Sequence, residues 1–136
     1  MQPAGYGAYR RIRTETASPA DLILQLYDGL MNNLQRAEDA MAAGQDLALA
    51  NAALLRAQDI VMELVASLDL DAGEIAEQLA DLYAYVYRRL IEANVQKDRD
   101  AVAEVIRLMG RIRDAWAQIV HTAPAVTAAG AYSFRA

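Results

Sequence analysis

The chain is long enough for one domain and one sizeable core, because 55% of its 136 residues are hydrophobic. Its net charge of -5 repels phosphate groups, so we expect neither nucleic-acid binding nor adsorption to anionic membranes. With no cysteine, the chain cannot form disulfides or thiolate metal sites. The N-terminal residues lack the apolar core of a signal peptide, so we expect a cytoplasmic protein without membrane insertion.

A first helix is predicted from Ser18 to just before Gly44. Ser18 can accept a hydrogen bond from a free backbone N–H, Pro19 stands where no N–H is needed, and Asp21 completes a capping box. The apolar residues that recur at spacings of four and three, and that would form its buried stripe, are Ile23, Tyr27, Leu30, Leu34, Ala37 and Met41.

Two further helices are predicted after short breaks. Asp46 opens a second helix that ends at residues 68–71, and Asp71 to Glu74 repeat the capping pattern before a third helix that ends near Asn94. The predicted stripe of the second helix is Leu47, Ala50, Leu54, Ala57, Val61, Leu64 and Leu68. The predicted stripe of the third is Ile75, Leu79, Leu82, Val86 and Leu90.

A fourth helix should follow Asp98, with a buried stripe of Val102, Val105, Met109, Ile112, Trp116 and Ile119. Each predicted helix has about 22 to 25 residues and the links are short, so consecutive helices must be antiparallel. We therefore predict an all-α, antiparallel up-down four-helix bundle over residues 18–121. Residues 1–17 are expected to form a short N-terminal arm, and residues 122–136 a mobile C-terminal tail.

The sequence contains little that could carry out chemistry. Its single histidine, His121, lies at the expected end of the fourth helix, where a solvated cation is the ordinary interpretation. Carboxylates such as Asp59 and Glu63 are four residues apart, as on any solvated helix face. A two-metal bundle site would need two histidines, and no glycine-rich phosphate loop is present. We expect no catalytic residue, no metal and no cofactor.

The helices carry more apolar residues than one core requires. At about 100° per residue, Leu55 and Met62 line up well outside the core stripe of the second helix. Leu24 and Met31 repeat this seven-residue spacing on one shoulder of the first stripe, and Tyr85 points away from the third. This surplus predicts a partner-binding surface. The plainer alternatives are an extra layer, such as the arm, over these positions, or scattered apolar residues without a role.

Two glycines fall inside predicted helices, where glycine costs roughly 1 kcal/mol relative to alanine. Gly29 borders the first core stripe, so close packing of a neighbouring helix is its expected reason. Gly110 faces outward and is interpreted as neutral.

Short motifs run along most of the chain and resemble one family when taken together. They are Thr16-Ala17-Ser18-Pro19, Leu26-Tyr27-Asp28-Gly29, Ala57-Gln58-Asp59-Ile60, Leu82-Tyr83, Tyr85, Arg88-Arg89-Leu90, Ala93-Asn94 and Ala115-Trp116. In this order and spacing they resemble the FliS family of flagellar export chaperones, from about Tyr6 to Ile119.

The resemblance implies an antiparallel helical bundle that binds the disordered C-terminal segment of flagellin in the cytoplasm. Such a chaperone prevents premature polymerisation and assists delivery to the export gate, without ATP or metal, and flagellar regulators are possible further partners. The client lies partly as helices in apolar grooves, and the chaperone's own N-terminal segment can occupy one groove. Tyr6 and Tyr9 would have that role here. We expect a monomer or weak dimer when the client is absent.

Three rival interpretations remain. The surplus apolar faces could join copies of a structural bundle, or the chain could serve a different export client. An enzyme is the third and least supported interpretation.

From the surplus apolar residues and the resemblance together, we expect partner-binding residues at Tyr6, Tyr9, Leu24, Met31, Leu55, Met62 and Tyr85.

Overall fold

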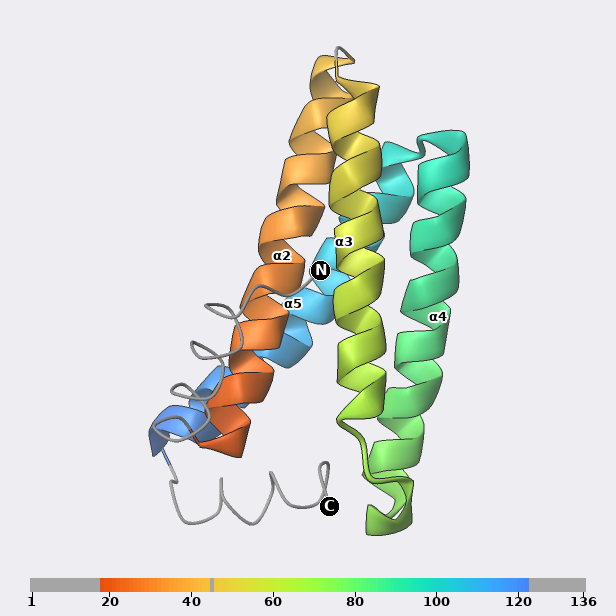
Figure 1. The fold of residues 1–136 in the computed structure, drawn as a ribbon. Coiled ribbons are helices and arrows are strands. Elements are labelled where there is room, and N and C mark those ends of the chain that lie inside the picture. The colour runs from red at the N-terminus through yellow and green to blue at the C-terminus, as the bar shows by residue number, and fades with distance from the viewer. Residues whose placement is uncertain (1–17, 45, 123–136) are drawn as a thin grey trace, which may run out of the picture.

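The computed structural model describes residues 18–44 and 46–122. These residues form α2 (Pro19–Ala43), α3 (Leu47–Ala66), the 3-10 helix η1 (Leu70–Ala72), α4 (Glu74–Gln96) and α5 (Arg99–Thr122), and no strand occurs among them. Consecutive helices are antiparallel, and α5 packs back against α2, so that the helices form a ring in the order α2, α3, α4, α5 (Figure 1). The predicted all-α four-helix bundle is confirmed. The predicted arm lies outside the described residues, and so does the predicted tail except for Thr122, which ends α5.

The ends of the first two helices agree with the sequence. Asp21 N–H donates to Ser18 Oγ at 3.1 Å and Ser18 N–H to Asp21 Oδ2 at 3.3 Å, which completes the predicted capping box. Gly44 ends α2 with a φ of 65°, a left-handed conformation in which glycine avoids the Cβ strain of other residues. Asp46 then caps α3 by accepting from Leu49 N–H at 2.9 Å.

The connection between α3 and α4 differs from the prediction. Helix α3 already ends at Ala66, and Asp69 accepts from Asp71 N–H, which starts η1 and not α4. Helix α4 begins after Gly73, which has a φ of 128° and provides no side-chain cap. The predicted capping box from Asp71 to Glu74 is therefore wrong, because Asp71 lies inside η1 and the residue that precedes α4 is Gly73.

The core runs along the inner faces of all four helices. Most of the predicted stripe positions are buried, and so are small residues that let the helices approach. The buried core residues are Ala20, Ile23, Tyr27, Leu30, Leu34, Ala37, Ala53, Leu54, Ala57, Val61, Leu64, Tyr83, Val86, Leu90, Ala93, Ala101, Val102, Val105, Met109 and Trp116. Helix α3 lies beside Gly29 as expected, but the Cδ1 atom of Ile60 is 3.5 Å from the position a Cβ would occupy, an ordinary contact distance, so this contact does not require glycine.

Two predicted core positions are wrong, because Leu47 is exposed in the first turn of α3 and Ile75 is 62% exposed. The predicted core residues that are only half-buried, but still pack against the core, are Met41, Leu68, Leu79, Leu82 and Ile112. At the start of α4, α5 lies beside α2 and away from α4 (Figure 1). Nothing in the described part of the chain therefore covers the side of α4 that carries Ile75. The inner face of α4 is turned by one residue toward Ala76 and Tyr83.

Tyr83 can lie in the core because its hydroxyl has a partner there. The hydroxyl oxygens of Tyr27 on α2 and Tyr83 on α4 are 2.5 Å apart, across the diagonal of the bundle. The Trp116 side chain on α5 also hydrogen-bonds Tyr27, and an indole N–H can only donate. Burial is the main cause that raises the pKa of Tyr83 to about 12, and it also raises the pKa of Tyr27. These three residues, the tyrosine–tryptophan network, link three helices.

Candidate partner-binding surface

The described residues contain no group of three or more histidines, cysteines or carboxylates placed to hold a metal ion. Among the same residues, no helix has the length and apolarity needed to cross a membrane.

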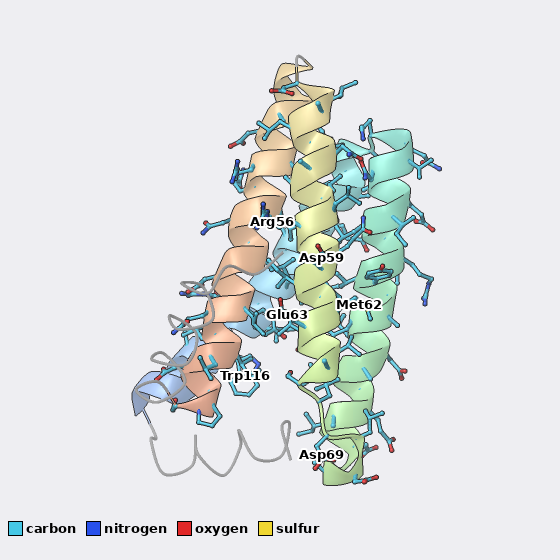
Figure 2. The ribbon with its side chains drawn as sticks, viewed as in Figure 1. Arg56, Asp59, Met62, Glu63, Asp69 and Trp116 are labelled. Carbon is cyan, nitrogen blue, oxygen red and sulfur yellow. The ribbon has the colours of Figure 1, made fainter. Side chains whose placement is uncertain are left out.

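Helix α3 presents two different edges to solvent. Leu55 and Met62 remain 48% and 49% exposed. In Figure 2 Met62 lies on the edge of α3 that faces α4, whereas Arg56 and Glu63 lie on the edge toward α2 and Asp59 lies between them. Since Leu55 and Met62 are seven residues apart, they share one edge. The outward apolar pair predicted on this helix is confirmed as exposed.

Helix α4 extends this apolar edge. Asn94 Nδ2 donates to Asn51 Oδ1 at 2.8 Å, which sets how the two antiparallel helices lie alongside each other. Residues after Asn51 are level with residues before Asn94, so Leu55 is level with the exposed Ile91. Val95, 79% exposed, lies one turn further along α4. We call Leu55, Met62, Ile91 and Val95 the α3–α4 surface.

The two helices that carry this apolar surface are acidic as a pair. From Asp46 to Gln96 the sequence has nine carboxylates and three arginines, whereas α5 carries four arginines and three carboxylates. An amphipathic segment with basic residues beside its apolar stripe would therefore meet favourable charges along α3 and α4. Such segments use residues one turn apart to contact a groove between helices.

Tyr85 is on the opposite side of α4 from the α3–α4 surface. Its side chain is 36% exposed, as predicted, but its hydroxyl donates to the Glu104 carboxylate on α5. Arg89 Nε donates to the same carboxylate at 2.8 Å, and Arg89 Nη1 to Glu92 at 3.1 Å. The bond from Tyr85 and the ion pair with Arg89 lower the pKa of Glu104. Tyr85 thus helps to hold α4 against α5, and a role in binding stays a prediction.

The other predicted residues are distributed differently. Leu24 and Met31 are half-buried and pack against the core, and the methyl group of Met31 lies 3.5 Å from the Cβ position of Gly110 on α5. They therefore lie toward the α2–α5 seam and not on the α3–α4 surface. Their open apolar area is smaller than expected, so their binding role stays a prediction. Tyr6 and Tyr9 lie outside the described residues.

Ile91 and Val95 were missed by sequence reasoning. Both follow a helical spacing of four residues, but spacing along the third helix does not show which of its sides adjoins α3. The Asn51–Asn94 hydrogen bond supplies that information, because it shows which edge of α4 adjoins α3.

Comparison with known proteins identifies the family. The family model described as flagellar protein FliS matches residues 2–123. The flagellar secretion chaperone FliS of Salmonella typhimurium is 39% identical over 122 residues, which cover 85% of this chain and 90% of the relative. The protein of that name from Bacillus subtilis is 34% identical over 117 residues, or 86% of each chain. The one from Escherichia coli is 36% identical over 121 residues, covering 82% of this chain and 86% of the relative. The match extends over almost the whole length of the chain, which therefore belongs to the FliS family, a family of chaperones and not of enzymes.

Proposed function

We propose that this chain is a cytoplasmic export chaperone that binds the disordered C-terminal segment of flagellin. In this role it prevents premature polymerisation and assists delivery of the client to the flagellar type III export apparatus. The observation that carries the proposal is the α3–α4 surface, whose apolar side chains are 40% to 79% exposed. Membership in the FliS family supports the flagellar setting.

The α3–α4 surface fits an amphipathic client segment. A segment destined for the helical core of a filament exposes an apolar stripe before assembly, and a groove between two helices can cover that stripe. Ordering such a segment costs a few kcal/mol, so a continuous apolar surface is needed to offset the cost. The arm with Tyr6 and Tyr9 covers the α3–α4 surface in the free protein, and export-gate components or flagellar regulators are further partners.

Calorimetry with the C-terminal segment of flagellin from the same bacterium tests the proposal. We expect a one-to-one complex and a negative heat-capacity change, because apolar surface is buried. A double variant, Leu55→Ser with Met62→Ser, should lose about 1 kcal/mol for each half-exposed side chain that the client buries. The combined loss for the two side chains, about 2 kcal/mol, corresponds to binding weakened by roughly thirtyfold.

Leu49→Ser provides the matched control, because Leu49 is an exposed leucine of the same helix outside the α3–α4 surface. It should leave the affinity unchanged. Unaltered binding by the double variant, or binding to the central flagellin domain and not to the C-terminal segment, contradicts the proposal. A stable homo-oligomer in light scattering that buries Leu55 and Met62 would favour the alternative, a bundle that self-associates.

A further inference from the structure

A cleft of about 750 Å³ lies along the seam between α2 and α5. In the ring of helices this seam is opposite the α3–α4 seam, and Figure 1 shows α5 behind α2 and α3. Gly110 contributes no side chain to the cleft, and Met31 and Ile106 line it beside this glycine. The cleft therefore has an apolar floor, and Gly110, interpreted from sequence as neutral, keeps that floor open.

The three arginines that line the cleft differ in whether they form ion pairs. Arg113 Nε donates to Asp28 Oδ1 at 2.8 Å, and its Nη1 to Asp114 Oδ1 at 3.4 Å, so this arginine is engaged by two carboxylates. Arg107 and Arg111, both exposed, line the same cleft and form no ion pair with another described residue. Arg107 contributes only a longer-range attraction that helps to lower the pKa of Glu104.

The spacing of these two arginines limits what can pair with both. They are four residues apart on α5, hence about 5 to 6 Å apart at their Cβ atoms. Carboxylates one turn apart on a second helix have the same spacing, and arginine pairs with carboxylates through parallel hydrogen bonds. An apolar residue between those carboxylates would lie over Met31 and Ile106.

We propose that this α2–α5 cleft is a second docking site, whose occupant is an acidic amphipathic helix of a protein partner. Its carboxylates pair with Arg107 and Arg111, and its apolar side chain packs on the floor at Gly110. Because the site is opposite the α3–α4 surface, it can be filled while that surface is occupied.

The test uses the full chain, labelled with ¹⁵N, and a synthetic alanine-based peptide helix with glutamates one turn apart and leucine between them. A second peptide with lysine in place of glutamate is the charge control. We expect saturable amide shifts at Met31, Ile106 and Gly110 with the acidic peptide only. Shifts confined to the α3–α4 surface, equal binding of the basic peptide, or no saturable shifts overturn the proposal.

Two double variants separate local from overall charge. Arg107→Glu with Arg111→Glu should weaken acidic-peptide binding about tenfold or more, because both pairs become repulsive. Arg56→Glu with Arg88→Glu makes the same change in net charge on exposed residues of α3 and α4, and should leave the affinity nearly unchanged. Equal weakening by both pairs would overturn the proposal.

Gly110→Leu blocks the floor without altering charge and should also abolish acidic-peptide binding. Circular dichroism checks that each variant remains folded, and a folded Gly110→Leu protein with undiminished binding contradicts the site. Binding of the flagellin segment is measured on the same variants. It should survive the Arg107 and Arg111 reversal, so the second site and the proposed function can fail independently.

Discussion

Removing the hydroxyl groups of the tyrosine–tryptophan network tests whether the core depends on a hydrogen bond between diagonally opposite helices. Tyr27 and Tyr83 are both buried, and phenylalanine keeps either ring while deleting its hydroxyl. A buried polar group that loses its partner costs about 1 to 3 kcal/mol. Tyr27→Phe removes the hydroxyl that contacts both Tyr83 and Trp116, whereas Tyr83→Phe removes a hydroxyl that contacts Tyr27 alone.

The expected order follows from counting these groups. Tyr83→Phe should cost about 1 kcal/mol and Tyr27→Phe roughly twice that or more. The double variant removes both hydroxyl groups at once and leaves neither of them without its partner, so it should be no less stable than Tyr27→Phe alone. Urea unfolding can follow the fluorescence of Trp116, the single tryptophan of the chain. If the double variant instead loses the sum of the two single costs to within about 0.5 kcal/mol, the tyrosines are not coupled and the reasoning is refuted.

The same pair predicts how stability depends on pH. Burial raises the pKa of Tyr83 to about 12 in the folded protein, against an ordinary value of 10.0. A group whose folded pKa is raised contributes its stability below the unfolded pKa and loses it as the pH rises toward the folded pKa. As the pH rises from about 10 to 12, each buried tyrosine should therefore lower the free energy of unfolding by about 1.4 kcal/mol per pH unit. A double phenylalanine variant with the same alkaline loss would contradict this explanation.

Three further outcomes are expected. Trp116→Ala should lose roughly 3 to 5 kcal/mol in urea unfolding, whereas Met62→Ser should leave the melting curve nearly unchanged; similar losses would mean that the wrong face is taken as buried. Leu90→Ala should cost roughly 2 to 5 kcal/mol and Leu82→Ala clearly less, because Leu82 is only half-buried; equal costs would contradict the observed burial. Deleting residues 1–15 should leave the bundle folded and tighten flagellin binding by about 1 kcal/mol in calorimetry, since a covering arm competes with the client. A truncated protein that binds flagellin more than about tenfold worse would exclude the covering role.

Much of the fold is readable from local signals. The capping box at Ser18, the left-handed end at Gly44 and the cap at Asp46 depend on residues within a few positions of one another, so their pattern is visible along the chain. The start of α4 is the counterexample. Asp71 to Glu74 have the residue types of a capping box. The 3-10 helix η1 forms at Leu70–Ala72 instead, where the chain reverses between α3 and α4.

The binding surface is less predictable, because exposure depends on which neighbour lies beside each helix edge. Leu55 and Met62 are recognisable since they lie far from any core stripe of their helix. From the sequence Tyr85 is expected to be exposed in the same way, but its hydroxyl donates a hydrogen bond to the Glu104 carboxylate of α5. Ile91 becomes part of the surface only through its neighbours on α3.

The sequence alone determined the helix class, the number of helices, the antiparallel order and most of the core, because periodicity, caps and short links are local properties. Its motifs also indicated the family. Only the tertiary structure decided the rotation of α4, the bond between Tyr27 and Tyr83 and the cleft at Gly110. These features join residues that are far apart in sequence, and their positions depend on how the helices pack and diverge, which no local pattern encodes.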